Sequence, residues 1–302
     1  MQEQTKPVSF CESRSDFTSG GVRCAADLYL PDSKGSPPVI IMGHGFAAER
    51  SFGLPAYAEY FVGQGMAVFL FDYRSFGDSD GEPRQLVNPR HHLDDWQAAI
   101  NHVRSLQSVD SKRIALWGSS FSGGHVVVTA ATSPGITAIV SQVPFVDALG
   151  SIREIGVGKI LSYTFRGFRD ISRKLTGRSP YYIQIVGKPG ESAFFTQPGS
   201  YDEYMSIIPK ESSWENRIPA RLFLLPPYRP IKYAPKVSCP ALVIIAEKDT
   251  LVSAAIQEEM AESLPKGEII RYPIGHFDIY KGKDFERTVQ SQASFLRIHL
   301  LD

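Results

Sequence analysis

Three serines stand within four positions in the stretch Trp117–Gly124, which reads WGSSFSGG. A serine hydroxyl attacks a carbonyl carbon when a base removes its proton and a strained turn between a strand and a helix exposes it. Such a turn needs small residues two positions before and two positions after the serine. Ser120 meets this requirement, with Gly118 before it and Ser122 after it. The alternative interpretation is a serine that caps a helix beside packing glycines.

The two neighbouring serines fit this turn less well. Ser119 has the bulky Trp117 and Phe121 at the corresponding positions, and Ser122 falls inside the helix that follows. We therefore predict that Ser120 is the nucleophile.

A serine nucleophile needs a base, and the base needs an acid that orients it. The apolar run ALVIIAEKD ends at Asp249, and the next apolar run, GEIIRYP, is followed by His276. Since parallel strands place their following loops on one edge of a sheet, Ser120, Asp249 and His276 are predicted to converge there. Their order along the chain is one known order of this triad. Glu247 and Asp278 are alternative acids, and Asp249 is favoured because it occupies the final turn of the strand.

Acyl transfer also needs hydrogen-bond donors for the oxygen that becomes negative. The turn GHGFAAER contains glycines that allow a close backbone approach. We predict that the backbone N–H groups of Phe46 and Phe121 form this oxyanion hole, and that His44 supports the turn. An ordinary glycine turn is the alternative. The remaining histidines, expected to have structural roles, are His91, His92, His102, His125 and His299.

These residues must be positioned by strands and helices that alternate along the chain. From about Val22, short apolar runs alternate with segments of helical period, which predicts a mostly parallel sheet covered by helices on both faces. The predicted strands are VRCAADLYL (22–30), PVIIMG (38–43), MAVFLFDY (66–73), RIALWG (113–118), ITAIVSQVP (136–144), ALVIIAEKD (241–249) and GEIIRYP (267–273).

The alternation stops after Pro144 and resumes near Pro235. The intervening residues, 145–235, are rich in Gly, Pro and aromatic residues, with a hairpin predicted around QIVGKPGESAFF. A structureless loop of that length is improbable, so we predict a cap inserted into a core formed by residues 1–144 and 236–302. Eight basic residues against two acids between Ser151 and Lys188 indicate a solvated helix face. A site for a carboxylate-bearing or CoA-linked substrate is the alternative.

The composition excludes several functional classes. The 32 basic and 32 acidic side chains cancel, so no overall field attracts nucleic acid or a membrane, and we expect a small-molecule partner. Three cysteines without CxxC spacing provide neither a disulfide scaffold nor a cysteine zinc site, and the predicted chemistry requires no cofactor and no metal. We expect a soluble cytoplasmic protein, since the chain starts without an export signal and contains no long apolar run. The sequence sets no oligomeric state.

Five motifs in order resemble the landmarks of the α/β-hydrolase superfamily: HGF, DYRSFGDSDG, GSSFSGG, EKD and GH. The resemblance covers residues 1–144 and 236–302 and implies an eight-stranded, mostly parallel sheet carrying the Ser120, Asp249 and His276 triad. Within the superfamily the chain looks most like bacterial dienelactone-hydrolase-like and X-prolyl-peptidase-like hydrolases. It departs from true dienelactone hydrolases, whose nucleophile is cysteine, and from G-x-S-x-G, because Ser122 stands at the last glycine.

The leading function is a serine hydrolase that cleaves a carboxylic ester, thioester or lactone through an acyl-enzyme. A peptidase, an amidase or an acyltransferase with the same triad is the alternative, since neither fold nor triad fixes the substrate. An aminopeptidase needs acids in the cap to bind an amine, and Glu191, Asp202 and Glu203 are the candidates. A non-catalytic binding protein on the same fold is a remote alternative, because such proteins usually lose a triad member.

Overall fold

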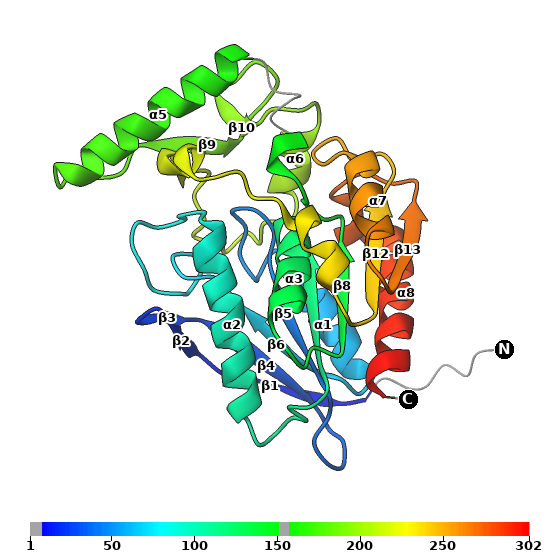
Figure 1. The fold of residues 1–302 in the computed structure, drawn as a ribbon. Helices are drawn as coiled ribbons and strands as arrows, with labels where there is room; N and C mark the ends of the chain where they lie inside the picture. The colour runs from blue at the N-terminus through cyan, green and yellow to red at the C-terminus, as the bar shows by residue number, and fades with distance from the viewer. Residues whose placement is uncertain (1–7, 151–156, 302) are drawn as a thin grey trace.

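A central sheet organises the chain, and the computed structural model describes residues 8–150 and 157–301. Within these ranges, eight strands form one sheet in the order β1-β4-β6-β5-β7-β8-β12-β13 (Figure 1). β1 and β4 run antiparallel to their neighbours, and the pairs from β6 to β13 are all parallel. The predicted fold class is thus confirmed. The strands are β1 (Phe10–Arg14), β4 (Ala26–Pro31), β5 (Val39–Gly43), β6 (Ala67–Phe71), β7 (Ile114–Ser119), β8 (Ala138–Gln142), β12 (Ala241–Ala246) and β13 (Gly267–Tyr272).

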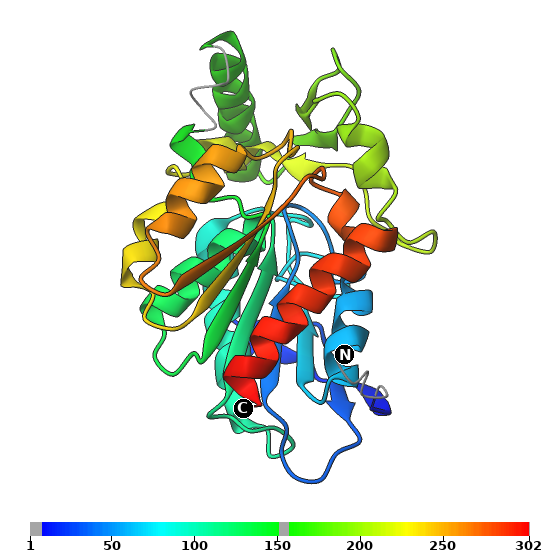
Figure 2. The same cartoon turned by 90° about the vertical axis from the view of Figure 1, so that its right-hand side faces the viewer.

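Helices cover both faces of this sheet, which explains why its inner strands are continuously apolar. Every residue of β5, β6, β7, β8 and β12 is buried. α2, α3 and α7 contribute to one apolar core, while α1 and α8 pack on the opposite face (Figure 2). These helices are α1 (Leu54–Gly63), α2 (Pro89–Ser105), α3 (Phe121–Thr132), α7 (Ala254–Glu262) and α8 (Gly282–Leu300).

The first strands differ from the prediction. The predicted strand 22–30 is divided at Ala25 into β3 (Val22–Cys24) and β4, and β3 pairs with β2 (Phe17–Ser19) in a separate two-stranded hairpin. The division arises because the Ala25 N–H donates to the buried Ser79 hydroxyl (2.8 Å). The edge strand β1 was not predicted, since all of its residues are exposed and leave no buried face in the pattern.

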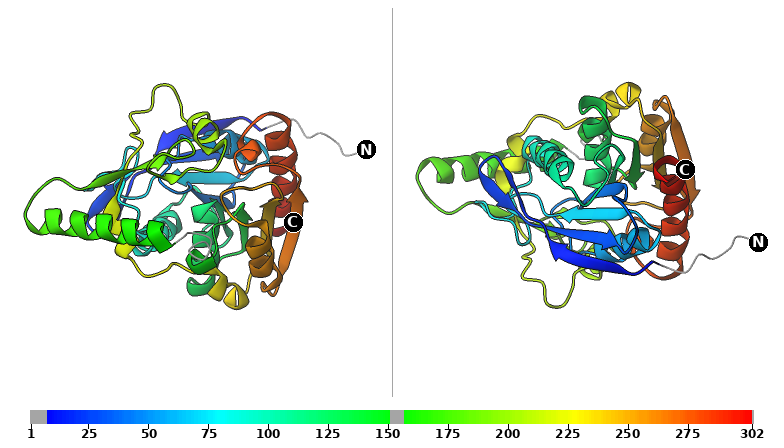
Figure 3. Two further views of the ribbon diagram at one scale, coloured as in Figure 1. Left: turned by 90° about the horizontal axis from the view of Figure 1, so that it is seen from above. Right: turned by 90° about the horizontal axis from the view of Figure 1, so that it is seen from below.

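The described residues between 145 and 235, which are 145–150 and 157–235 and are called here the inserted segment, lie over the carboxyl ends of the parallel strands (Figures 1 and 3). Its described residues add no strand to the central sheet and form a small three-stranded sheet of their own. The predicted hairpin is wrong, because β9 and β10 pair in parallel, and the antiparallel partner of β9 is the distant β11. The elements are α5 (Val157–Leu175), β9 (Tyr182–Val186), β10 (Ala193–Phe195), α6 (Ser200–Met205), β11 (Ile218–Pro219), η1 (Ala220–Leu224), η2 (Pro230–Lys232) and η3 (Ala234–Lys236).

The two ends of the inserted segment meet beside the central sheet. The Ile231 N–H donates to the Val146 carbonyl (3.0 Å). The guanidinium of Arg229 forms a two-point ion pair with the Asp147 carboxylate, at 2.8 Å for each contact. These contacts form a closed neck, so the segment leaves and rejoins the core at one place.

Candidate active site

The junction between β7 and α3 holds Ser120 in a strained backbone conformation. Its φ of 56° and ψ of −115° lie outside the regions that non-glycine residues usually occupy. The Ser120 N–H donates to the Gln142 carbonyl (2.8 Å), and the Phe145 N–H donates to the Ser120 carbonyl (2.9 Å). A Cβ on Gly118 would overlap the backbone of Ser122, so this position requires glycine. The conformation is that expected of a nucleophile elbow.

The structure brings the three residues of the predicted triad together. His276 Nε2 lies 3.1 Å from Ser120 Oγ, and His276 Nδ1 lies 2.6 Å from Asp249 Oδ2. The Asp249 side chain is fully buried, and its Oδ1 accepts hydrogen bonds from the backbone N–H groups of Leu251 (2.8 Å) and Val252 (2.9 Å). A carboxylate bonded to Nδ1 orients the imidazole so that Nε2 faces the hydroxyl.

The two alternative acids lie elsewhere. Glu247 is exposed just beyond the end of β12. Asp278 begins the short helix η4 (Asp278–Tyr280) and accepts a hydrogen bond from the Gly275 N–H (2.8 Å). Among the contacts of residues 8–150 and 157–301, neither carboxylate reaches the imidazole of His276. The structure therefore pairs this histidine with Asp249.

The loop after β5 lies against the elbow and carries one of the two predicted oxyanion donors. A Cβ on Gly45 would lie 3.2 Å from the Ser120 Cβ, so a glycine permits this approach. The rings of Phe46 and Phe121 meet edge-on, with centroids 5.5 Å apart. In the described part of the chain, the backbone N–H of neither phenylalanine donates to a protein acceptor. Both are thus available to an oxygen of a bound molecule.

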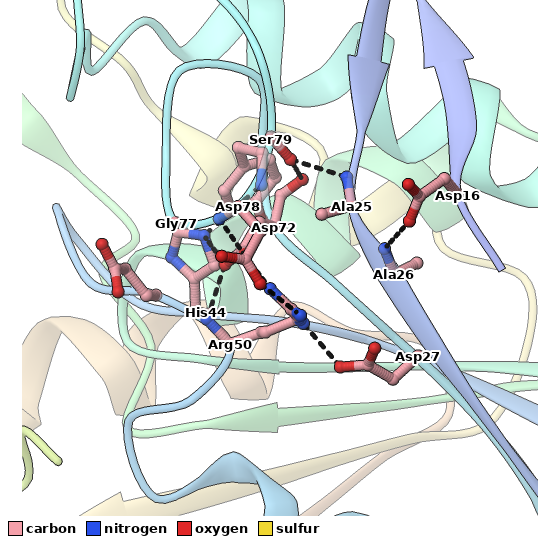
Figure 4. Close-up of polar contacts among 12 residues, drawn as sticks. Asp16, Ala25, Ala26, Asp27, His44, Arg50, Asp72, Gly77, Asp78 and Ser79 are labelled. Atoms are coloured by element: carbon pink, nitrogen blue, oxygen red, sulfur yellow. Dashed lines mark hydrogen bonds and ion pairs between the residues drawn. The ribbon is translucent and has the colours of Figure 1, made fainter. Parts of the chain in front are cut away.

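A cluster of charged residues around Arg50 fixes the position of the loop after β5 (Figure 4). Arg50 forms ion pairs with Asp27, Asp72 and Asp78, and its backbone N–H donates to Asp72 Oδ1 (2.7 Å). The Asp72 carboxylate is fully buried, which costs free energy because it is removed from water. Its hydrogen bonds and ion pair with Arg50 offset this cost. A Cβ on Gly77 would overlap that carboxylate, which explains why the first glycine of DYRSFGDSDG stands at this position. This motif therefore positions the loop.

Two buried histidines near the elbow are bonded to other groups. His44 Nδ1 lies 3.1 Å from the Gly45 carbonyl, His44 Nε2 accepts a hydrogen bond from the Tyr73 N–H (3.4 Å), and His125 Nδ1 lies 2.7 Å from the Tyr228 hydroxyl. Burial lowers the pKa of His44, and it lowers the pKa of His125 to about 3, so both rings are neutral near pH 7. His276 is the histidine that the structure places within hydrogen-bond distance of the serine.

Ser122 has a role that the sequence did not indicate. Its buried hydroxyl donates to the His44 carbonyl and also contacts the Tyr73 hydroxyl. Because the single proton of Ser122 goes to His44, Tyr73 must donate to Ser122, and the Tyr73 oxygen accepts the Trp96 Nε1–H (2.8 Å). The hydroxyl therefore ties the first turn of α3 to the loop after β5.

The inserted segment also supports this loop. The Tyr204 hydroxyl donates to the Phe46 carbonyl (3.1 Å), and Trp214 Nε1–H donates to the Ala47 carbonyl (2.8 Å). Sequence reasoning missed both residues, because they lie in a stretch without periodicity and more than a hundred positions from the loop that they contact.

A cavity of about 750 Å³ opens onto Ser120 and His276. Its wall combines residues of the core loops with residues of the inserted segment and is largely aromatic and aliphatic. The rings of Phe46 and Phe194 stack with centroids 4.7 Å apart, and those of Tyr163 and Phe223 stack at 4.3 Å. The cavity suits a ligand with a substantial apolar part.

Residues 8–150 and 157–301 contain no group of three or more His, Cys, Asp or Glu side chains that could hold a metal ion. In the same ranges, no helix has the length and hydropathy that crossing a membrane demands. Cys11, Cys24 and Cys239 are all free thiols.

Comparisons with known proteins identify the family and the fold of the chain. Residues 20–170 match the family described as X-Pro dipeptidyl-peptidase (S15 family). The quorum-quenching protein AidA of Acinetobacter baumannii is 36% identical and aligns over 93% of both chains. The thiohydrolase aneE of Aspergillus aculeatus is 25% identical over 93% of this chain and 91% of its own. The crystal structure of the α/β hydrolase GrgF from Penicillium sp. sh18 is similar with a TM-score of 0.82 and 26% identity, covering 97% of this chain and all of that one.

Proposed function

Because the chain belongs to the X-Pro dipeptidyl-peptidase (S15) family of α/β hydrolases, we propose that it is a serine hydrolase that cleaves a carboxylic ester, thioester or lactone. The observation that carries this proposal is the position of His276 between Ser120 Oγ and Asp249 Oδ2. Ser120 attacks the carbonyl carbon, while His276 accepts the hydroxyl proton and passes it to the leaving group. The N–H groups of Phe46 and Phe121 bind the developing oxyanion, and water then hydrolyses the acyl-enzyme.

The cavity supports an apolar acyl group as the part of the substrate that is recognised. Its volume of about 750 Å³ is typical of sites for small organic molecules, and Phe46, Phe194 and Phe223 contribute aromatic surface to it. The name of the relative aneE, a thiohydrolase, supports thioesters as well as oxygen esters among the substrates. None of the proposed steps requires a metal ion or a cofactor.

The charges around the cavity favour this substrate class over an aminopeptidase substrate. An aminopeptidase binds a free amine with carboxylates, and the cavity wall includes the carboxylate of Asp147, which is engaged by Arg229. Glu191, Asp202 and Glu203, considered from the sequence as amine-binding acids, are not among the residues that line the cavity.

The proposal is tested with aryl esters of increasing acyl length, together with the corresponding acyl thioesters and lactones. We expect the wild-type protein to hydrolyse them and Ser120→Ala to lose this turnover by several orders of magnitude. Ser162→Ala, a substitution of an exposed serine in α5, is the matched control and should retain full activity.

A fluorophosphonate probe identifies the nucleophile independently, because it phosphonylates an activated serine with loss of fluoride. Peptide mapping should place the label on Ser120, and a label on Ser119 or Ser122 would contradict the assignment. Faster cleavage of Gly-Pro-p-nitroanilide than of any ester would overturn the substrate class while leaving Ser120 as the nucleophile.

A further inference from the structure

Ser119, the serine that precedes the proposed nucleophile, belongs to a chain of buried hydrogen bonds that begins at Trp117. Trp117 Nε1–H donates to Gln292 Oε1 (2.6 Å), and Gln292 Nε2–H donates to Gln142 Oε1 (2.7 Å). Gln142 Nε2–H then donates to Ser119 Oγ (3.0 Å), which also contacts the Tyr280 hydroxyl. Because the indole N–H is only a donor, it fixes the orientation of both amides, and all three bonds point from Trp117 toward Ser119.

This direction leaves one hydroxyl proton without a protein acceptor. Ser119 and Tyr280 carry one hydroxyl proton each, and one of these protons lies in the bond between the two oxygens. Within residues 8–150 and 157–301, no acceptor receives the other proton. Ser119 is fully buried and is not part of the cavity wall, whereas Tyr280 is partly exposed and lines the cavity. Since an unpaired hydroxyl proton is costly in the core, Ser119 donates to Tyr280, and the unpaired proton is that of Tyr280.

Tyr280 belongs to the same short stretch of the cavity wall as the histidine of the proposed triad. It lies in η4, four residues after His276, and both residues line the cavity together with Phe277. A Cβ on Gly53 would lie 3.2 Å from Tyr280 Cδ1, so this glycine leaves room for the tyrosine ring. Burial raises the pKa of the Tyr280 hydroxyl to about 12, so the group stays protonated and able to donate near pH 7.

The other tyrosine hydroxyls of the cavity wall are bonded differently. Those of Tyr163 and Tyr204 donate to backbone carbonyls (3.2 and 3.1 Å), and that of Tyr228 is hydrogen-bonded to a histidine ring (2.7 Å). The Tyr280 hydroxyl accepts a hydrogen bond from the protein and keeps its own proton for a bound molecule. It is therefore a fixed donor in a wall that is otherwise largely apolar.

We propose that the Tyr280 hydroxyl donates a hydrogen bond to an oxygen atom of the substrate that lies outside the scissile carbonyl group. This inference rests on the proposed function, which makes the bound molecule an ester, a thioester or a lactone. A substrate with a hydrocarbon chain alone leaves this donor unpaired, whereas one with an ether, hydroxyl or keto oxygen at the right position satisfies it. Tyr280 thus selects an oxygen-bearing substrate over a plain hydrocarbon one.

An ether scan tests the proposal. Aryl octanoate and octyl acetate are each compared with analogues in which an ether oxygen, which only accepts hydrogen bonds, replaces one methylene at successive positions. Calorimetric titration measures their binding to Ser120→Ala, which lacks the nucleophile, and to Ser120→Ala/Tyr280→Phe. We expect at least one ether analogue to bind Ser120→Ala roughly threefold to tenfold more tightly than its hydrocarbon parent, the contribution of one neutral hydrogen bond, and to lose this preference in the double variant.

Tyr163→Phe in the same background is the matched control, because the Tyr163 hydroxyl donates to the protein, and it should keep the preference. Ser119→Ala tests the direction of the chain. The preference should not rise in this variant, since Tyr280 already presents its proton, and a rise would show that Tyr280 donates to Ser119 and would overturn the proposal. Circular dichroism confirms that each variant is folded.

Two further results would overturn the proposal. One is that no ether analogue binds Ser120→Ala more tightly than its parent, and the other is that Tyr280→Phe leaves the preference intact. Because binding is measured without turnover, neither result depends on ester cleavage. Hydrolysis of the same esters by the wild-type protein tests the proposed function separately.

Discussion

Substitution of Ser122 by alanine removes the hydroxyl that joins α3 to the loop after β5. The change leaves two buried groups without partners, the O–H of Tyr73 and the carbonyl of His44. An unsatisfied buried polar group costs about 1–3 kcal/mol, so with two such groups the free energy of unfolding should fall by roughly 2–6 kcal/mol. Ser122→Gly, which introduces the usual residue of G-x-S-x-G, should cost about 1 kcal/mol more, because glycine disfavours a helix.

Equilibrium unfolding in urea, followed by tryptophan fluorescence, measures this loss. Ser294→Ala is the matched control, since Ser294 lies in α8 and donates its hydroxyl to the Gln290 carbonyl (2.9 Å) while remaining exposed. The control should change the free energy of unfolding by less than about 0.5 kcal/mol. If Ser122→Ala changes the free energy of unfolding as little as this control does, the hydrogen bonds of the Ser122 hydroxyl with Tyr73 and His44 contribute nothing to stability, and the reasoning is refuted.

Three further substitutions test other parts of the site. Gly118→Ala should lose ester hydrolysis, because its Cβ overlaps the first turn of α3, whereas Ser162→Ala, at an exposed position of α5, should retain activity in the same assay. Burial raises the pKa of Glu49 from 4.5 to about 7. Between these two pH values the folded state binds more protons than the unfolded state, so the free energy of unfolding declines as the pH rises from 4.5 to about 7. Urea midpoints of Glu49→Gln should lack that decline, and an unchanged pH profile would contradict it. Tyr204→Phe removes the hydrogen bond to the Phe46 carbonyl and should lower kcat for an aryl ester roughly threefold to tenfold, equivalent to about 1 kcal/mol; an unchanged kcat would mean that the loop keeps its position without this bond.

The sequence predicts most of the sheet because its strands are covered on both faces. A strand in that position is apolar throughout, as the five residues of β5 illustrate, and the end of each strand is then visible in the sequence. The convergence of Ser120, His276 and Asp249 was predictable for the same reason, since each follows a parallel strand of one sheet.

The elements that escaped prediction lack such a signal. β1 is exposed at every residue, and the partner of β9 is β11, which follows after α6 in the chain. Tyr204 and Trp214 act through side-chain hydrogen bonds to a distant loop, and a single sequence does not encode such pairs as a local pattern. The excess of basic residues between Ser151 and Lys188 predicts a helix, and the structure has α5 there.

The closed neck of the inserted segment should make this region replaceable in protein engineering. Since Val146 and Ile231 are already joined, replacing the intervening chain changes only a loop whose ends stay fixed, and doubling its length costs only about 0.6 kcal/mol of closure entropy. A chimera carrying a foreign cassette should therefore retain the folded sheet. The chimera will be an efficient enzyme only if the new segment also donates hydrogen bonds to the loop after β5, as Tyr204 and Trp214 do. Substrate range and catalytic rate must therefore be redesigned together.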